Sequence, residues 1–142
     1  MSCAACDSIE RIRRGENDRF IAELSESYLV LGDDQFYEGW CVLLTKDHQE
    51  HLAELPPERS MRLWQDVIRT AAAMTRELRP VRINYECLGN LLHHIHWHIV
   101  PRYQNDPDPQ SPIWLRPPEQ RKGNLSPQRR TELVRQLRAA IG

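Results

Sequence analysis

Four of the six histidines in this 142-residue chain lie within the six positions from His93 to His98. Three of them, His94, His96 and His98, alternate along the chain. Successive side chains of a β-strand point to opposite faces, so these three imidazoles would share one face, about 7 Å apart. Histidine titrates near neutrality, and a row of three suits metal binding or the handling of an anion such as phosphate. A polar sheet face in contact with water is the alternative.

The residues between these histidines indicate how the strand is held. Ile95, Trp97 and Ile99 would lie on the opposite face, where they can pack in a core. His93 falls on this apolar side. We expect its side chain to be hydrogen-bonded within the protein or partly exposed, and not to take part in the chemistry. The strand therefore has one face for packing and one for chemistry.

A second group of reactive residues is the N-terminal sequence CAAC. It places Cys3 and Cys6 at the spacing of a zinc-binding pair, although a redox pair or chance would give the same pattern. Cys41 and Cys87 occur in apolar strands and are expected to be buried structural thiols. Four cysteines without the basic-then-apolar pattern of a signal peptide predict a reducing, cytoplasmic location.

The composition is that of a globular domain, with 40% apolar and 27% charged residues. A net charge of −1 and a pI near 6.6 give no general attraction to nucleic acid or anionic membranes. No apolar run approaches the roughly 18 residues of a membrane span. We therefore expect neither partner. Four arginines in the last helix could suggest RNA, but the balanced charge favours a solvated face; they are Arg129, Arg130, Arg135 and Arg138.

The elements around the histidines predict an α+β domain. A short helix over residues 7–14 is followed by strands in "RFIAEL", "SYLVLG" and "WCVLLTK". The clearest helix runs from Pro57 to Leu78, since Pro57 suits a first helical position and Pro80 ends the pattern. "VRINYECLG" is a further strand. The apolar face of the long helix is predicted by helical spacing at Met61, Trp64, Ile68, Ala71, Thr75 and Leu78.

We expect one domain over residues 1–142, without internal repeats. It would comprise an N-terminal CxxC segment (residues 1–15), a proline-rich loop (residues 104–125) and a C-terminal helix (residues 126–142). The stretch from residue 104 to 120 holds five of the ten prolines and reads as an extended loop.

The sequence HIHWHIV, from His94 to Val100, fits at every position the histidine triad (HIT) signature His-φ-His-φ-His-φ-φ, where φ is apolar. With "LGN" before it and "PRY" after it, the chain resembles the bacterial diadenosine polyphosphate hydrolase-like branch of that family. The resemblance runs from "CAAC" through "PRY" and is weaker over the last 40 residues. It implies an antiparallel sheet of about five strands with a long helix packed on it and a C-terminal helix.

The resemblance also implies a nucleotide hydrolase or transferase that acts at the α-phosphate of an adenosine polyphosphate or phosphoramidate. His96 would be the nucleophile and carry a nucleotidyl intermediate. A neutral imidazole is a good nucleophile when an acceptor holds its other ring nitrogen. His98 would contact the non-bridging or departing oxygens, and His94 would brace the row or bind a metal. No organic cofactor is implied, and the loop of residues 104–120 would shape the leaving-group side.

Four further residues are candidates for contacts with the substrate. Asn90, four residues before His94, would hydrogen-bond the phosphate, or it is simply a turn residue after a glycine. Asn84 is a weaker candidate for a phosphate contact, or it is simply a polar residue of a strand. Asp33 and Asp34 fall where relatives hold both ribose hydroxyls; the sequence does not separate them, and Asp34 is favoured. The conformation of a turn would also explain both aspartates.

Some relatives bind a structural zinc with a CxxC pair, the histidine of a Lys-x-His pattern and the first triad histidine. Here these ligands would be Cys3, Cys6, His48 and His94, a closed tetrahedral site. His51 competes with His48 but breaks the Lys-x-His match.

One position departs from the family pattern. Many relatives have Pro-Gly-His where this chain has Glu38-Gly39-Trp40, and the missing histidine usually supports the triad. Its loss puts in doubt how the row is braced. We expect Trp40 to pack near the pocket, and zinc on His94 to replace part of the bracing that Trp40 cannot give.

Two other functions compete with the hydrolase. A nucleotide-binding or sensing module with little turnover is suggested only by Trp40. A metal-dependent enzyme that uses the triad as ligands lacks an obvious carboxylate partner. The resemblance also implies a homodimer, paired through an edge strand and the long helix that presents Trp64.

Overall fold

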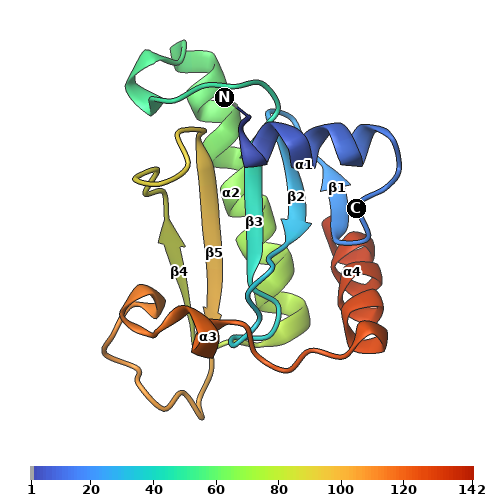
Figure 1. Cartoon of the computed structure of the whole chain (residues 1–142), viewed down its shortest axis with the longest axis vertical. Coiled ribbons are helices and arrows are strands. Elements are labelled where there is room, and N and C mark those ends of the chain that lie inside the picture. The colour runs from blue at the N-terminus through green and yellow to red at the C-terminus, as the bar shows by residue number, and fades with distance from the viewer. Residues whose placement is uncertain (1) are drawn as a thin grey trace.

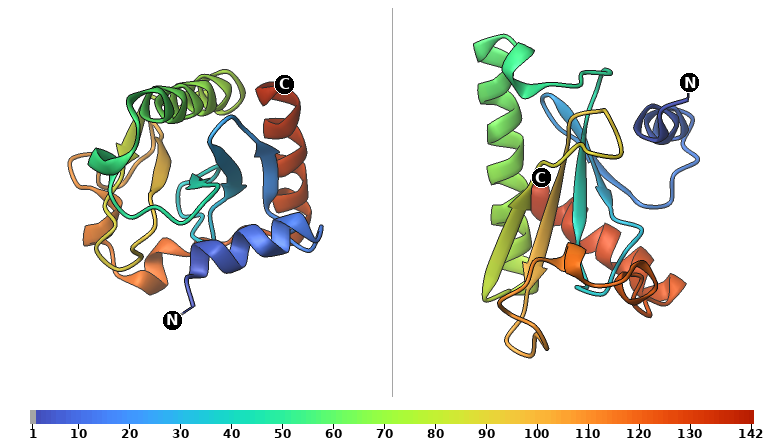
Figure 2. Two further views of the ribbon diagram at one scale, coloured as in Figure 1. Left: turned by 90° about the horizontal axis from the view of Figure 1, so that it is seen from above. Right: turned by 60° about the vertical axis from the view of Figure 1, so that its left-hand side comes forward.

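The computed structural model describes residues 2–142 and contains a five-stranded antiparallel sheet with helices on both faces (Figures 1 and 2). The strands, in the sheet order β1-β2-β3-β5-β4, are β1 (Phe20–Glu23), β2 (Ser27–Leu31), β3 (Cys41–Thr45), β5 (His96–Arg102) and β4 (Arg82–Glu86). The helices are α1 (Ala4–Arg13), α2 (Pro57–Leu78), α3 (Pro118–Arg121) and α4 (Pro127–Ile141), with 3₁₀ turns η1 (Leu52–Glu54) and η2 (Ile113–Leu115). The α+β fold predicted from the sequence is confirmed.

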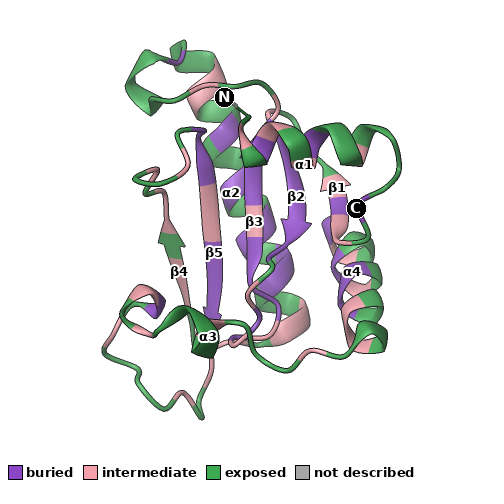
Figure 3. Cartoon of the chain, viewed as in Figure 1, coloured by how far each residue is buried: buried purple, intermediate pink, exposed green. Residues whose placement is uncertain are grey.

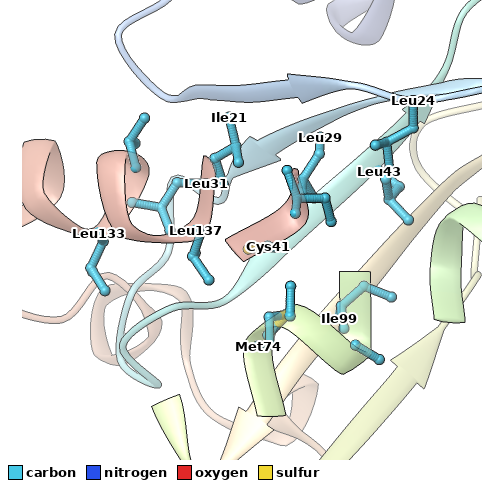
Figure 4. Packing of buried hydrophobic residues seen from close by; sticks show 14 of the residues in the cluster. Ile21, Leu24, Leu29, Leu31, Cys41, Leu43, Met74, Ile99, Leu133 and Leu137 are labelled. Carbon is cyan, nitrogen blue, oxygen red and sulfur yellow. The ribbon is translucent and has the colours of Figure 1, made fainter. Parts of the chain in front are cut away.

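The main core lies between the sheet and the pair α2 and α4, which contact each other (Figures 2 and 4). All five residues of β2 are buried because helices cover both of its faces. Leu29 and Leu31 join the main core, whereas Tyr28 and Val30 pack against α1 on the other face. This alternation follows from the two-residue repeat of a strand. The buried strands run through the middle of the sheet in Figure 3.

Helix α2 has the predicted bounds, and Arg79 ends it in a left-handed conformation (φ 51°) before Pro80. Its predicted packing face is partly wrong. The sheet covers a stripe one step around the helix, formed by Leu63, Val67, Thr70, Ala71 and Met74. Met61, Trp64 and Ile68 are exposed by 65%, 49% and 46%. Spacing fixes the period of an apolar stripe, but two adjacent stripes share that period and only tertiary packing selects one.

Helix α1 begins earlier than predicted. Its first residue is Ala4 rather than Asp7, because the carbonyl of Cys3 accepts a hydrogen bond from the Asp7 amide at 2.9 Å. Cys3 therefore caps the helix and Cys6 lies in its first turn. The proline-rich segment likewise is not simply extended, since η2 and α3 interrupt it. No helix within residues 2–142 is long and apolar enough to cross a bilayer.

Candidate active site

The histidine row lies on the sheet face that α1 partly covers. Strand β5 begins only at His96, so His94 precedes the strand but keeps its side chain on the same face, where it is 1% exposed. Ile95 points to the opposite face and packs with Leu55 and Leu63. The ring centroids of His96 and His98 are 5.1 Å apart. The row therefore has the one-sided arrangement that the alternating sequence predicts, while His93 is exposed.

His96 is held in a single tautomer by the backbone. Its Nδ1 lies 2.6 Å from the carbonyl oxygen of His94. A carbonyl only accepts hydrogen bonds, so Nδ1 must carry the proton. The lone pair is thereby left on Nε2, which is the form of imidazole that can attack phosphorus.

His98 is held in the opposite tautomer by Trp40. The indole Nε1 donates to His98 Nδ1 at 3.1 Å, and Trp40 is almost fully buried. An indole only donates, so Nδ1 of His98 is the acceptor and its proton lies on Nε2. Burial, together with the nearby charge of His96, lowers the pKa of His98 to about 4. The expectation that Trp40 cannot brace the row is wrong: the indole replaces the missing histidine at His98.

We expect these two imidazoles to show opposite tautomers in long-range ¹H–¹⁵N spectra at neutral pH, with Nδ1 protonated in His96 and Nε2 protonated in His98. His98 should stay neutral on acidification until about pH 4. Between its unfolded pKa near 6.5 and about 4, the folded state binds fewer protons than the unfolded state, so stability falls as the pH falls through this window. Trp40→Phe removes the indole donor and should release the tautomer of His98 alone. Matching tautomers in the wild type would contradict the assignment.

A first hollow of about 300 Å³ opens between α1, the ends of β2 and β3, and the two histidines. Asp33 and Asp34 both lie on its lining. Arg19 pairs with Asp33 at 2.5 Å, and the Asp33 side chain is 76% exposed against 30% for Asp34. Below these polar residues the lining is apolar, and it is formed by Val30, Val42, Leu44 and Leu92. A polar rim over an apolar floor suits a nucleoside.

A second hollow of about 370 Å³ lies on the other side of His96 and His98. Asn90 lines it, and its side chain is free to face solvent. Trp114 and Arg121 also line it. The proline-rich loop was predicted to shape the leaving-group side of the pocket, but neither Trp114 nor Arg121 was predicted to line it. The available signal was the presence of an aromatic and a cationic side chain in a loop expected to shape the pocket.

Asn84 is not brought to the histidines. It pairs with Val100 across the sheet, two positions beyond His98, and its side-chain oxygen accepts from Arg102 at 2.9 Å. Arg102 is itself buried and bound to Asp106 at 2.6 Å. The phosphate contact suggested for Asn84 is therefore not supported by its position.

Two cysteines and two histidines meet beside the row. The ligand atoms of Cys3, Cys6, His48 and His94 all lie within 4.8 Å of one another. Nδ1 of His94 is 3.5 Å from Cys3 Sγ and 3.6 Å from Cys6 Sγ. Nδ1 of His48 is 3.6 Å from Cys6 Sγ. A tetrahedral zinc with ordinary bond lengths would separate a sulfur and a nitrogen ligand by about 3.5 Å.

The orientation of His94 also fits a metal ligand. Its Nε2 lies 2.9 Å from the carbonyl oxygen of Thr45, so that nitrogen carries the proton and Nδ1 is free for a metal. His51 is not part of the cluster. Cys41 is fully buried as expected, and burial raises the pKa of its thiol to about 12, whereas Cys87 is only half-buried.

Comparison with known proteins gives three kinds of result. The family model of the HIT domain matches residues 13–105. The chain is similar to a histidine triad protein from Bradyrhizobium japonicum (22% identity, TM-score 0.77, covering 87% of this chain and 90% of the other). It is similar to a zinc-bound histidine triad family protein from Mycobacterium smegmatis (25% identity, TM-score 0.71, covering 99% of this chain and 94% of the other). A hypothetical histidine triad nucleotide-binding protein from Sulfolobus tokodaii also resembles it (18% identity, TM-score 0.73, covering 96% of this chain and 91% of the other). No curated protein matches it.

Proposed function

The chain belongs to the HIT domain family, whose members generally act on nucleotides, and we propose that it cleaves a nucleotide at the α-phosphate through a nucleotidyl intermediate on His96. One observation carries this proposal. His96 presents an unprotonated Nε2 where two hollows meet, and both hollows are lined by His96 and His98. A nucleophile placed between a site for the nucleoside and a site for the leaving group is what such a displacement needs.

The reaction would proceed in two displacements. Nε2 of His96 attacks the α-phosphorus, the bond from phosphorus to the leaving atom breaks, and the electron pair departs with the leaving group. The proton on Nδ1 then faces the carbonyl of His94, which stabilises the cationic ring of the intermediate. Water then attacks the same phosphorus and loses a proton to the solvent, while the phosphorus–nitrogen bond breaks. Its electron pair returns to Nε2 of His96, and the nucleoside monophosphate is released. The Nε2 proton of His98 would donate to a non-bridging or departing oxygen, and Asn90 would donate to the phosphate.

The substrate would be an adenosine polyphosphate, as in the diadenosine polyphosphate hydrolase-like branch, or an adenosine phosphoramidate. Asp33 and Asp34 line the hollow expected to take the nucleoside, where a carboxylate can accept from both ribose hydroxyls. Asp34 is the better placed of the two because its side chain is less exposed, and its ion pair with Arg121 is longer, at 3.7 Å, than the 2.5 Å pair of Asp33 with Arg19.

A panel of substrates with products identified by mass spectrometry tests the proposal. The panel should contain diadenosine tetraphosphate, ATP and adenosine 5′-phosphoramidate, and AMP release from at least one of them is expected. A protein that binds these compounds without releasing AMP would instead be a sensing module. The structure gives that alternative less support than the sequence did, because Trp40 braces His98.

The third function, a triad that itself holds a catalytic metal, is not supported by the geometry. Within residues 2–142, the cluster with metal-ligand spacing is the one containing Cys3, and it includes His94 but neither His96 nor His98. We propose a structural zinc there and no organic cofactor. We also propose a cytoplasmic location, since all four cysteines are free thiols.

The absence of a nucleic-acid partner stays a prediction, and contacts within the chain support it. Arg129 pairs with Glu38 and Arg130 with Asp18, while Arg138 donates to the carbonyls of β1. These three arginines already have partners, and Arg135 is the exposed one of the four for which no such contact is seen within residues 2–142.

We expect a homodimer in solution. The exposed apolar stripe of α2, with Met61, Trp64 and Ile68, has no cover, and the edge strand β4 exposes Tyr85 by 45%. An uncovered apolar patch beside a sheet edge is typical of an interface between subunits. Light scattering should give twice the 16.7 kDa of one chain.

The variant Trp64→Glu should give a folded monomer. Gln128→Glu is the matched control, since it adds one negative charge at an exposed position of α4, outside the stripe of α2, and should leave the dimer intact. A wild-type mass of one chain at micromolar concentration would contradict the expectation.

A further inference from the structure

The second hollow, lined by Asn90, Trp114 and Arg121, is distinct from the hollow that holds Asp33 and Asp34, yet the two share His96 and His98. If the reacting phosphorus sits at His96 with its nucleoside on the Asp34 side, whatever leaves must depart into the second hollow. The chemistry of its lining therefore bears on the leaving group, which the family alone does not fix.

Among residues 2–142, Arg121 is the one lysine or arginine on the lining of the second hollow. Its guanidinium lies over the ring of Trp114, 5.0 Å from the ring centroid. The Nε atom is buried and has no hydrogen-bond partner, and its nearest acid is Asp34 at 3.7 Å. One terminal nitrogen donates to the carbonyl of Arg116 at 3.2 Å. Arg19, in the first hollow, is by contrast paired with Asp33 at 2.5 Å. Arg121 thus makes one hydrogen bond and one long ion pair, and within residues 2–142 its second terminal nitrogen, Nη2, has no hydrogen-bond partner.

The backbone fixes Arg121 in this place. The amides of Gln35 and Phe36 donate to the carbonyls of Lys122 and Arg121 at 3.0 and 2.9 Å. Gly123 allows the approach: its φ is 71°, and a Cβ there would lie 2.6 Å from the Gln35 backbone. Any other residue would push this segment away from the sheet.

Trp114 is fixed independently. Its Nε1 donates to the carboxylate of Glu86, and its ring centroid lies 4.9 Å from that of His98. Arg102 holds the preceding loop by donating to the carbonyls of Asp108 and Ser111 at 2.7 and 2.9 Å. The wall of the hollow is therefore built before any ligand arrives, which lowers the cost of ordering on binding.

We propose that the second hollow is a leaving-group subsite and that Arg121 makes it selective for a phosphorylated leaving group, such as the nucleoside phosphate released from a dinucleoside polyphosphate. This inference rests on the proposed function. When the bond between the α-phosphorus and the bridging oxygen breaks, the electron pair stays on a phosphate oxygen, and a guanidinium can bind this growing charge. An amine leaving group takes up a proton and departs neutral, so it gains nothing from Arg121. The exposed Leu88 and Leu91 of the same hollow offer apolar surface to a base.

The kinetic test compares two substrates in matched variants. Arg121→Gln should lower kcat/KM for diadenosine tetraphosphate by roughly 10- to 100-fold, the equivalent of one charge-assisted hydrogen bond, and change that for adenosine 5′-phosphoramidate by less than about twofold. Arg116→Gln is the control: this arginine belongs to the same segment and lies over the ring of Phe36, 4.1 Å away, but does not line the hollow. Equal losses for both substrates, or none for the tetraphosphate, would overturn the proposal.

A binding test separates this inference from the proposed hydrolysis. In a His96→Gly background, which lacks the nucleophile, adding Arg121→Gln should raise the Kd for diadenosine tetraphosphate about tenfold or more by calorimetry and leave that for AMP unchanged. AMP fills only the nucleoside hollow and the phosphate position, so an equal loss for AMP would overturn the subsite. Absence of AMP release by the wild type from every substrate would count against the hydrolase and leave this binding comparison decisive for Arg121.

Discussion

Replacement of His96 by alanine is expected to lower turnover of the preferred nucleotide by a factor on the order of 10⁴ or more, as for other nucleophile deletions. The reason is that Nε2 of His96 is the one imidazole nitrogen of the row that is both unprotonated and placed at the junction of the two hollows. Nucleotide binding should remain measurable, because Asp34 and the apolar floor of the nucleoside hollow are untouched. Single-turnover AMP release and calorimetry measure the two effects.

His93→Ala is the matched control for this prediction. His93 belongs to the same segment, is exposed and lines neither hollow, so its removal should leave turnover near the wild-type value. Near-normal activity in a folded His96→Ala protein would exclude His96 as the nucleophile. Trapping the nucleotidyl intermediate from a denatured reaction mixture should place AMP on the peptide that contains His96, and AMP on another residue would move the assignment.

The fold was predictable because its signals are local. Prolines mark the ends of α2, a short apolar run marks β2 and alternation marks β5, so the elements and their order follow from spacing and turn residues. The packing face of α2 was not predictable in the same way. Its two adjacent apolar stripes are equivalent in sequence, and the choice between Leu63 and Trp64 is made by the sheet and α4, which are distant along the chain.

In the candidate site, too, the features with local sequence signals were predictable and the long-range contacts were not. Three alternating histidines and a CxxC pair are short patterns, and the structure brings their residues together as the sequence suggested. The hydrogen bond from Trp40 to His98 joins residues 58 positions apart, and no short sequence pattern predicts it. Arg121 reaches the second hollow only because Gly123 lets its segment approach Gln35. Contacts of this kind depend on long-range packing. A single sequence therefore shows which residues are present but not which of them come into contact.

Removal of the two N-terminal thiols by Cys3→Ser with Cys6→Ser is expected to release zinc and to lower the melting temperature by on the order of 10 °C, since a structural zinc site contributes folding free energy directly. The four ligand atoms already lie at separations that fit a tetrahedral zinc, and the metal would tie the start of α1 to His48 and to His94 before β5. Elemental analysis of protein purified without chelator or metal-affinity tag should find about one zinc per chain. Less than about a tenth of an equivalent would mean that CAAC is a bare pair.

The kinetic consequence of losing zinc follows from where α1 lies. Ala4, Ala5 and Ser8 of this helix line the nucleoside hollow, whereas the Nδ1 of His96 is held by the backbone carbonyl of His94, and the metal would bind only the side chain of that residue. The double serine variant should therefore raise KM for the nucleotide more than it lowers kcat. His48→Ala should share this behaviour, while His51→Ala and Cys87→Ser, which lie outside the cluster, should keep both the zinc and the melting temperature. A variant without zinc that keeps the wild-type KM and melting temperature would show that α1 is anchored by packing of Ala5 and Ile9 on the sheet alone.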